Sequence, residues 1–294
     1  MSSTSWPKIS VVTPNYNHGR FIETTLKSVL DQHYPNLEYI VIDGGSSDES
    51  ISVIQCYEKQ LAHWETRINE GQYQAIARGL NRATGDILCW LNSDDAYLPG
   101  ALSIVADVFT QFPQIDWLTT LYPLHWDEQG RLVRADHLRG FSRHGFFHGE
   151  HLPATNSFSL GYIQQESTFW RRSLWQVAGS FDPDFPRAGD FALWAQFFQH
   201  AELCGLATPL GGFRVHGAQI SSRSYPAYYA EAVSALKKNG GAITGGGWRW
   251  MREAATRCPV ALHATLERCQ LMNRSMFVRW DLSAGRWKLE ERFI

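Results

Sequence analysis

Short apolar runs alternate with amphipathic stretches along the N-terminal third of the chain. Apolar residues recur at helical spacing from about Arg20, and again between Gly71 and Ala83. Short, mainly apolar or β-branched runs of strand length separate these stretches, at Ile9–Thr13, Leu37–Ile42 and Ile87–Leu91. Strands that alternate with helices in this way predict a parallel sheet with right-handed crossover connections.

The second half of the sequence is less regular. Residues from about His125 to Gln165 are rich in Gly, His and Arg, which indicates loops that cover a site. Helical patterns return at 173–177 and 191–198, and 213–216 has the pattern of a short strand. The tail from about Tyr225 onward is predicted to be mainly helical, with breaks at two glycine clusters.

The composition fits one large α/β domain or two small ones in 294 residues, with 44% hydrophobic content to fill a core. A formal net charge of −2 argues against a nucleic-acid binder that works through a broad basic face. The five scattered cysteines lack a C-x-x-C pair, which favours a reducing compartment over a disulfide framework or a zinc site. The short polar start is unlike a signal peptide, and no run approaches the roughly 18 apolar residues of a spanning helix. We therefore expect a cytoplasmic protein, with contact at the inner face of the membrane left open.

Two adjacent acids, Asp94 and Asp95, come just after the third apolar run. Ligands of parallel sheets bind beyond the carboxyl ends of the strands, and paired acids there need a cation or donors to compensate their repulsion. Adjacent side chains at a strand end diverge, so one acid can bind a metal while the other accepts from a hydroxyl. Hard oxygen ligands favour Mg²⁺ or Mn²⁺. The alternative is a turn-forming or helix-capping pair ahead of Pro99.

A second polar cluster follows the first two apolar runs. Asp43 precedes two glycines and could accept from the imide N–H of a pyrimidine base, or be an ordinary turn residue. Tyr16 should lie beside it at the same sheet edge, where its ring could stack on the base. The 12 Trp residues suit flat sugar-binding surfaces, although a core would accommodate most of them equally well.

Three motifs follow one another in the first third of the chain: ISVVTPNYN at 9–17, VIDGGSSD at 41–48, and ATGD at 83–86 leading to LNSDD at 91–95. Further segments follow downstream, at 165–172 (QESTFWRR), 179–182 (GSFD), 189–194 (GDFALW) and 213–216 (FRVH). Taken together, in this order and spacing, the segments resemble the family-two glycosyltransferases of the GT-A fold. The match extends from Lys8 to Ser221. It implies an α/β fold with a Rossmann-like, mostly parallel central sheet flanked by helices, and a C-terminal helical extension.

The resemblance assigns roles position by position. Asp95 would bind Mn²⁺ or Mg²⁺ on the diphosphate, with His216 as a further ligand, although a histidine after a strand is more often structural. Asp190 would be the general base, and from the residues alone it could equally be the N-cap of the helix that it opens. The family often has Asp where this chain has Asn92, which weakens the metal assignment slightly. The residues that would hold the nucleotide sugar are Thr13, Pro14, Tyr16, Asp43, Gly71, Asn92 and Asp94.

These roles describe one in-line displacement with inversion, because no second carboxylate is placed as a covalent nucleophile. The implied donor is a nucleoside-diphosphate sugar, with UDP favoured over thymidine or guanosine nucleotides. The implied acceptor is a hydroxyl of a glycan or lipid-linked saccharide in surface polysaccharide synthesis. We expect a catalytic domain at 1–224, with a nucleotide-sugar half at about 8–97 and an acceptor half at 98–224, followed by an extension at 225–294.

Three other functions are weighed against this one. A catalytically inactive sugar-nucleotide-binding or scaffold protein of the same fold is the main alternative, and the acids Asp94, Asp95 and Asp190 argue against it. A Rossmann dehydrogenase would need G-x-G-x-x-G after the first strand, where this chain has PNYNHG. A nucleotidyltransferase usually begins with a basic, glycine-rich phosphate loop, which the sequence also lacks there.

Aromatic and basic residues mix in the tail at 245–252 and again at 276–280. Trp and Arg suit a bilayer interface, where a lipid-linked acceptor would be met. Glu253, Glu267, Glu290 and Glu291 would be repelled by an anionic surface. A helical lid on the catalytic domain, or a homodimer contact, is therefore favoured over peripheral membrane binding.

Overall fold

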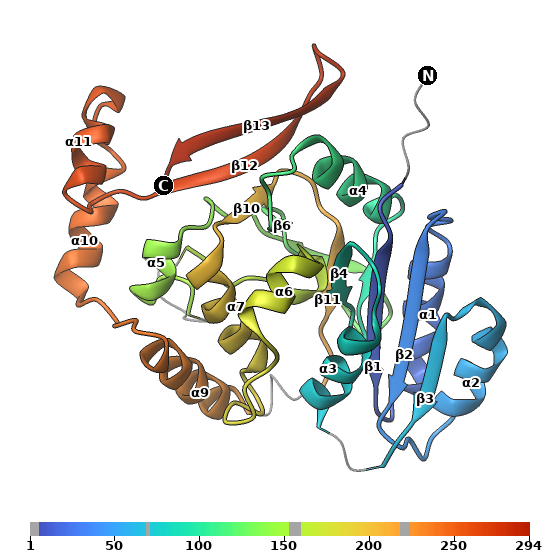
Figure 1. Ribbon diagram of the computed structural model, residues 1–294. Coiled ribbons are helices and arrows are strands. Elements are labelled where there is room, and N and C mark those ends of the chain that lie inside the picture. Colours follow the sequence, from blue (N-terminus) through green and yellow to red (C-terminus); the bar gives the residue numbers. More distant parts are fainter. Residues whose placement is uncertain (1–5, 69–70, 153–159, 218–223) are drawn as a thin grey trace.

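The computed structural model describes residues 6–68, 71–152, 160–217 and 224–294. Ser221, where the family resemblance ends, lies outside these residues. The N-terminal half has the predicted alternation of strands and helices (Figure 1). Its elements are β1 (Ile9–Asn15), α1 (Gly19–Leu30), β2 (Leu37–Asp43), α2 (Ser50–Tyr57), β3 (His63–Thr66), α3 (Gln72–Arg82) and β4 (Ile87–Trp90).

One large sheet forms the centre of the described chain, in the order β13-β12-β10-β6-β9-β4-β1-β2-β3. β1 pairs in parallel with β2 and β4, and β2 pairs in parallel with β3. β9 runs antiparallel between β4 and β6, so the predicted mostly parallel sheet is confirmed with one reversed strand inside it. A smaller sheet, β5-β11-β7-β8, brings β11 next to the residues that follow β4. These strands are β5 (Ala96–Tyr97), β6 (Trp117–Thr120), β7 (Leu124–Trp126), β8 (Leu132–Ala135), β9 (Phe169–Arg171), β10 (Leu203–Leu206) and β11 (Gly211–Arg214).

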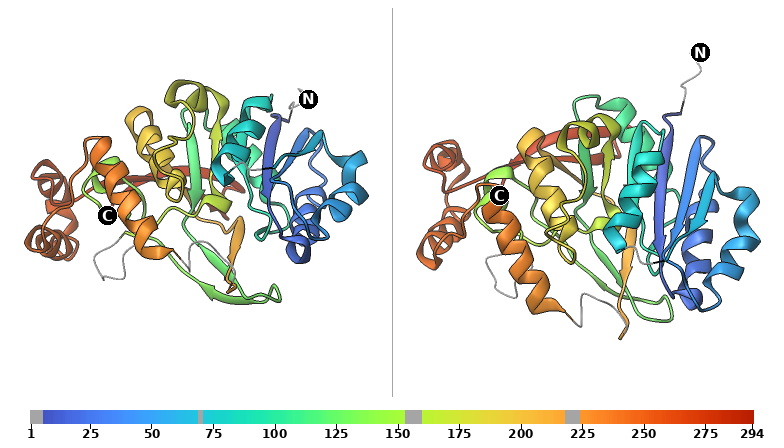
Figure 2. Two further views of the ribbon diagram at one scale, coloured as in Figure 1. Left: turned by 90° about the horizontal axis from the view of Figure 1, so that it is seen from below. Right: turned by 60° about the horizontal axis from the view of Figure 1, so that its bottom comes forward.

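Helices cover both faces of the large sheet (Figure 2). α1 and α2 lie on one face and α3 on the other, because right-handed crossovers that run in opposite directions along a sheet place their helices on opposite faces. α7 begins beside α3, where Tyr73 contacts the chain at Arg187 and Asp190. The helices of the middle region are α4 (Ala101–Gln111), α5 (Arg143–Phe147), α6 (Arg172–Ala178) and α7 (Gly189–His200).

Tryptophan rings fill the space between α7 and the sheet. Trp90, Trp117, Trp170 and Trp194 are buried, and the rings of Trp90 and Trp194 stack with their centroids 5.5 Å apart. Large rings packed in this way contribute much of the apolar area that a core removes from water. The core alternative is confirmed for Trp117, Trp170 and Trp194, whereas Trp90 is buried and also lines the pocket described below.

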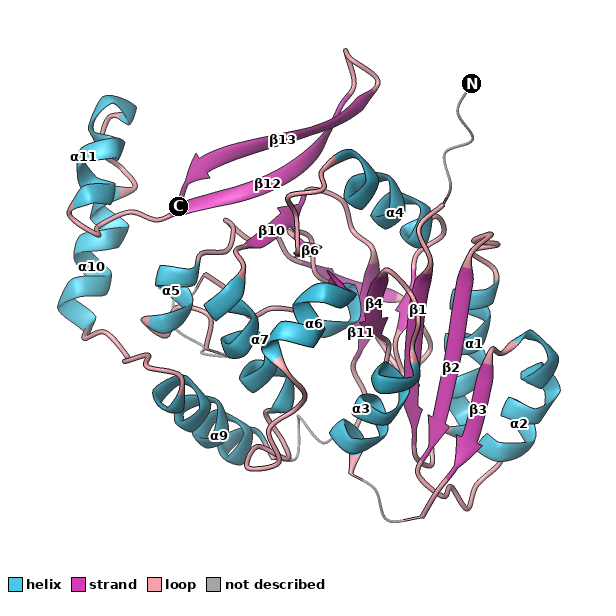
Figure 3. Cartoon of the chain, in the orientation of Figure 1, coloured by secondary structure: helices cyan, strands magenta, loops and turns pink. Residues whose placement is uncertain are grey.

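The C-terminal region is helical only as far as Arg268. It contains α9 (Tyr225–Lys238), α10 (Gly246–Ala255) and α11 (His263–Arg268), followed by a hairpin of β12 (Arg274–Asp281) and β13 (Arg286–Phe293) that extends the large sheet past β10 (Figure 3). The expectation of a mainly helical extension was therefore wrong for this last segment. The aromatic and basic residues at 276–280 belong to β12, where the side chain of Arg279 pairs with Glu290 across the hairpin at 2.9 Å.

In the part of the chain that the structure describes, no helix is both long and apolar enough to cross a membrane. Trp250 of α10 is 65% exposed, and Met251 beside it is also exposed. The membrane hypothesis also concerned three residues whose side chains lie outside the described part of the chain, namely Trp248, Arg249 and Glu253.

Candidate active site

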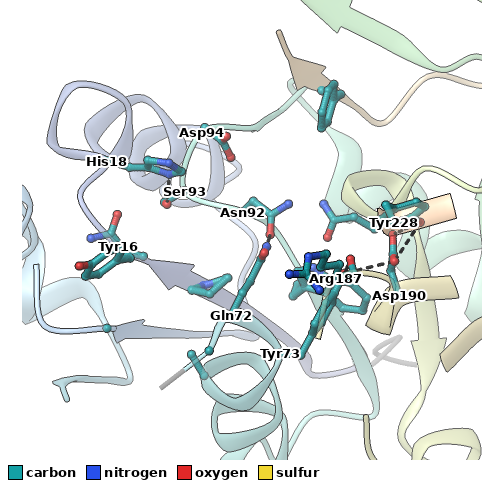
Figure 4. A pocket seen from close by; sticks show the side chains of 18 of the residues that line it. Tyr16, His18, Gln72, Tyr73, Asn92, Ser93, Asp94, Arg187, Asp190 and Tyr228 are labelled. Atoms are coloured by element: carbon teal, nitrogen blue, oxygen red, sulfur yellow. Dashed lines mark hydrogen bonds between the residues drawn. The ribbon is translucent and has the colours of Figure 1, made fainter. Parts of the chain in front are cut away.

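A pocket of about 390 Å³ opens where β1 and β4 end (Figure 4). Its walls come from the ends of these strands, the first turns of α3 and α7, and α9. Among the described residues, Thr13, Asp43, Asp95 and His216 do not line it, although the sequence assigned them to the site. The predicted residues that do line it are Pro14, Tyr16, Gly71, Asn92, Asp94 and Asp190.

Asp94 and His216 meet at one side of this pocket. The distance from Asp94 Oδ2 to His216 Nε2 is 3.0 Å, and the His216 side chain is buried against the ring of Phe21. His18 joins the pair, because the ligand atoms of His18, Asp94 and His216 all lie within 4.8 Å of one another. The His18 ring is oriented by its Nδ1, which lies 2.8 Å from Ser93 Oγ.

This donor set fits a divalent cation. One carboxylate oxygen and two imidazole nitrogens converge from three segments of the chain, and Asp94 and His18 face the pocket. Imidazole ligands favour Mn²⁺ over Mg²⁺, which prefers oxygen. Burial, and then the charges of Asp94 and Glu166, raise the pKa of Asp95 well above its ordinary value. Several buried acids therefore lie close together, and a cation held there would favour their charged forms.

The Asp95 carboxylate is not among the grouped ligand atoms and has protein partners of its own. Its Oδ1 accepts from the backbone N–H of Arg214 at 2.9 Å, its Oδ2 lies 3.4 Å from Asn92 Nδ2, and the residue is 0% exposed. Arg214 also donates from Nε to the carbonyl of Asp94 at 2.7 Å. The structure thus places Asp94 in the cluster instead of the predicted Asp95, because neighbouring side chains diverge after β4. Asp95 instead fastens β11 to the turn.

Asn92 and Gln72 both line the pocket and are hydrogen-bonded to each other. Gln72 Nε2 donates to Asn92 Oδ1 at 2.9 Å, which leaves the Asn92 amide N–H₂ directed at Asp95. An aspartate at this position would face Asp95 with a second negative charge, so the amide suits this chain. At the outer rim Tyr16 is 62% exposed, so its ring is free to stack on a base.

The Asp43 carboxylate is turned into its own loop. Its Oδ1 accepts from Asn15 Nδ2 at 2.7 Å and Ser46 Oγ at 2.6 Å, and its Oδ2 accepts from Gly45 N at 3.0 Å, Ser46 N at 2.9 Å and Thr66 Oγ1 at 2.7 Å. Burial raises the pKa of Asp43, but the hydrogen bonds from these donors outweigh it and hold the pKa below its ordinary value. The acid shapes the loop beside the predicted base subsite, and its oxygens already have protein partners.

Asp190 lies at the opposite side of the pocket from Asp94 (Figure 4). Its Oδ1 accepts from the Tyr73 hydroxyl at 3.1 Å and from the N–H of Phe191 at 2.8 Å, while the Tyr228 hydroxyl contacts both oxygens. Burial raises the pKa of Asp190 above its ordinary value, and these hydrogen bonds act in the opposite direction. Ala188, not Asp190, is the N-cap residue of α7, so the capping alternative is wrong.

Sequence reasoning missed several residues that line the pocket. Tyr73 stands among the apolar residues at helical spacing in α3, a pattern that also fits a core position and therefore gives no sign of a pocket. His18 follows directly on the first motif, which is the signal that could have identified it. Tyr228 had no signal, because α9 approaches α7 only in the folded chain. The missed residues include His18, Gln72, Tyr73, Arg187 and Tyr228.

Known proteins similar in sequence point to one family. The model described as glycosyl transferase family 2 matches residues 10–157. An uncharacterized glycosyltransferase of Mycobacterium tuberculosis is 31% identical over 191 residues, which cover 64% of this chain and 67% of that protein. The GalNAc(5)-diNAcBac-PP-undecaprenol beta-1,3-glucosyltransferase of Campylobacter jejuni is 36% identical over 101 residues, which cover 33% of each chain.

Solved structures confirm the predicted GT-A fold. The 1–349 segment of S. aureus TarS in complex with UDP-GlcNAc matches with a TM-score of 0.61 and 17% identity, over 88% of this chain and 73% of that one. Mannosyltransferase PcManGT from Pyrobaculum calidifontis, in complex with GDP-Man and Mn²⁺, matches with a TM-score of 0.60 and 17% identity, over 91% of this chain and 80% of that one.

Proposed function

We propose that this chain, which belongs to glycosyl transferase family 2 and is a glycosyltransferase, moves a sugar from a nucleoside-diphosphate sugar to a hydroxyl with inversion. One observation carries the proposal: Asp94, in a cluster suited to a cation, and Asp190, a carboxylate with a raised pKa, face one pocket from opposite sides. In-line displacement needs this arrangement, because the leaving group and the attacking hydroxyl lie on opposite sides of the anomeric carbon.

Asp190 performs the proton transfer in this mechanism. It takes the proton of the acceptor hydroxyl as that oxygen bonds to the anomeric carbon, while the bond from the carbon to the diphosphate oxygen breaks on the opposite face. Asp94, His18 and His216 would hold Mn²⁺ or Mg²⁺, and the bound cation supplies charge stabilisation for the departing diphosphate. Asp95 supports this site indirectly, because its carboxylate accepts from the N–H of Arg214 and so holds the turn after β4 in place.

A UDP-sugar is the favoured donor. Tyr16, Pro14 and Gly71 line the pocket, and Gly44 of the Asp43 loop lies against the Tyr16 ring, which is available for stacking. Similar structures were solved with UDP or UDP-GlcNAc, while the PcManGT complex holds GDP-Man and keeps guanosine as the alternative. We assign the nucleotide-sugar half to residues 8–97 and the acceptor half to residues 98–224.

The proposed acceptor is a glycan or a lipid-linked saccharide in surface polysaccharide synthesis. The name of the Campylobacter jejuni relative includes a diphosphate-linked undecaprenol. Such an acceptor would bring a cytoplasmic enzyme to the inner face of the membrane, and Trp250 and Met251 are exposed for that contact or for a homodimer. Sedimentation with anionic vesicles tests the first, and light scattering without vesicles tests the second.

A donor screen tests the activity itself. Purified protein is incubated with UDP-glucose, UDP-galactose, UDP-GlcNAc, GDP-mannose or dTDP-rhamnose, with Mn²⁺, Mg²⁺ or excess chelator, and released nucleoside diphosphate is measured. We expect release from one donor class, abolished by the chelator. A protein that binds a donor by calorimetry and releases nothing, with or without saccharide acceptors, would instead be the inactive binding protein.

A further inference from the structure

Two tyrosine hydroxyls hold the Asp190 carboxylate, and they come from distant parts of the chain. Tyr73 lies in the first turn of α3, and its hydroxyl is 3.1 Å from Asp190 Oδ1. Tyr228 lies on α9, beyond residues 10–157 that the family model matches, and its hydroxyl is 3.0 Å from Oδ1 and 3.1 Å from Oδ2. Both side chains line the pocket with Asp190 (Figure 4).

The two carboxylate oxygens of Asp190 are not equivalent. Oδ1 receives the Tyr73 hydroxyl, the N–H of Phe191 and a share of the Tyr228 hydroxyl. Oδ2 receives only the other share of Tyr228 among the described contacts. Since an ionised carboxylate oxygen can accept about two hydrogen bonds, Oδ2 has the remaining capacity to take a proton.

Both tyrosines remain donors to this carboxylate at neutral pH. Burial, and then the charge of Asp190, raise the pKa of Tyr73 and of Tyr228 well above the ordinary value for tyrosine. The space for Tyr73 is provided by Gly189, because a Cβ at that position would lie 2.6 Å from a carbon of the Tyr73 ring.

A carboxylate one turn along α9 fixes this helix to the start of α7. Glu231 accepts from the backbone N–H of Arg187 at 2.7 Å and of Ala188 at 3.0 Å, and from the Arg187 guanidinium at 2.8 Å. It therefore holds the two residues that lead into α7, whose N-cap residue Ala188 makes no side-chain cap of its own. Tyr228 and Glu231 are three residues apart on one face of α9. Through these two side chains, α9 contacts both the Asp190 carboxylate and the backbone just before α7.

Resting on the proposed role of Asp190 as the base, we propose that Tyr73 and Tyr228 are positioning residues that occupy Oδ1 and turn Oδ2 toward the acceptor hydroxyl. The C-terminal helix α9 is then a part of the active site. An acceptor hydroxyl gives its proton to Oδ2 as its oxygen bonds to the anomeric carbon, while the tyrosines keep their own protons.

The test compares Tyr73→Phe and Tyr228→Phe with Tyr229→Phe, a matched control one position along α9. Hydrolysis of the panel donor that the wild type turns over best is measured with Mn²⁺ and water as acceptor. We expect kcat to fall about tenfold in each of the first two variants, with the KM for donor unchanged, and Tyr229→Phe to match the wild type. The acid limb of the pH profile should move to higher pH, because each hydroxyl stabilises the charged carboxylate.

A second measurement needs no turnover. The Asp190 carboxyl is titrated by ¹³C NMR, with its signal assigned by comparison with Asp190→Asn. It should titrate at higher pH in Tyr73→Phe and Tyr228→Phe than in the wild type and in Tyr229→Phe. Identical titrations in all four proteins, or wild-type kcat in Tyr228→Phe, would overturn the positioning role.

The two proposals fail in different ways. If Asp190→Asn hydrolyses donor as fast as the wild type, Asp190 is not the base and the proposed mechanism is wrong. If Asp190→Asn is inactive while Tyr73→Phe and Tyr228→Phe behave as the wild type in both measurements, only the positioning role is wrong.

Discussion

Replacement of Asp43 separates a loop-building acid from one that contacts the nucleotide base. Five hydrogen bonds converge on a carboxylate that offers roughly four lone-pair positions, so the protein already uses its accepting capacity. Asp43→Ala leaves the N–H groups of Gly45 and Ser46 without their acceptor, at about 1–3 kcal/mol each. We expect the free energy of unfolding to fall by about 3–5 kcal/mol in total.

Asp43→Asn keeps the size of the side chain and removes its charge. Charge-assisted hydrogen bonds become neutral ones of about half the strength. The side-chain oxygen of Asn15, which has no partner in the structure, can accept from the new amide. We therefore expect a smaller loss in the free energy of unfolding, about 1–2 kcal/mol.

The pH dependence of stability gives the sign of the charge effect. The pKa of Asp43 is lowered in the folded protein, so its stabilisation is present above the unfolded pKa of about 3.9 and is lost as the pH falls through the folded value. Asp43→Asn should lose most stability at pH 7 and approach the wild type in acid.

Urea unfolding at neutral and acidic pH measures these changes, and calorimetry with UDP measures binding by the folded variants. If the Asp43 carboxylate acts by holding its loop, the stability and the UDP affinity of both variants should fall together. If both variants unfold as the wild type does while UDP affinity falls, the carboxylate contacts the base directly and the reasoning from the loop is refuted.

Three further predictions concern the pocket. Asp94→Ala should abolish Mn²⁺ binding, measured by calorimetry, and lower donor turnover at least about a hundredfold. Asp95→Ala should mainly lower the urea midpoint of unfolding. The opposite pattern would show that Asp95 is the metal ligand. Asp190→Asn should lower transfer by about 10²–10⁴-fold with donor affinity kept, and in the wild type transfer should rise with pH as Asp190 loses its proton, at a pH above the ordinary Asp pKa. Gly189→Ala should displace the Tyr73 ring and lower kcat as Tyr73→Phe does, and unchanged kcat would show that the ring can move without cost.

The sheet could be predicted because its inner strands are buried on both faces. All seven residues of β1 are buried, and most of them are apolar or β-branched, which the sequence shows as a strand-like run. β3 is the strand at one end of the sheet, and its residues, His63 to Thr66, are only partly buried or exposed. It therefore left no apolar run and was missed. β12 was missed for a similar reason, because its arginines pair with β13 and interrupt its apolar positions.

The position of the candidate site in the fold could be predicted more easily than the contacts between its side chains. Parallel topology alone brings the residues after β1, β2 and β4 to one edge, so Tyr16, Asp43 and Asp94 were predicted to be neighbours. Which of Asp94 and Asp95 faces the pocket depends on β11, whose Arg214 N–H binds one of them. That strand lies more than a hundred residues later, and no local pattern shows which acid it meets.

The contacts of the C-terminal region decide which experiment can test it. Removal of everything after Ser224 would test membrane docking only if this region were a separate extension. The structure joins it to the enzyme twice: α9 brings Tyr228 to Asp190, and β12 pairs with β10 in the central sheet. Such a truncation would remove part of the site and expose an unpaired strand edge, so lost activity or solubility would reveal nothing about lipid. Substitution of Trp250 and Met251, which are exposed on α10, leaves both connections intact, so vesicle sedimentation of that variant tests the membrane contact without damage to the site.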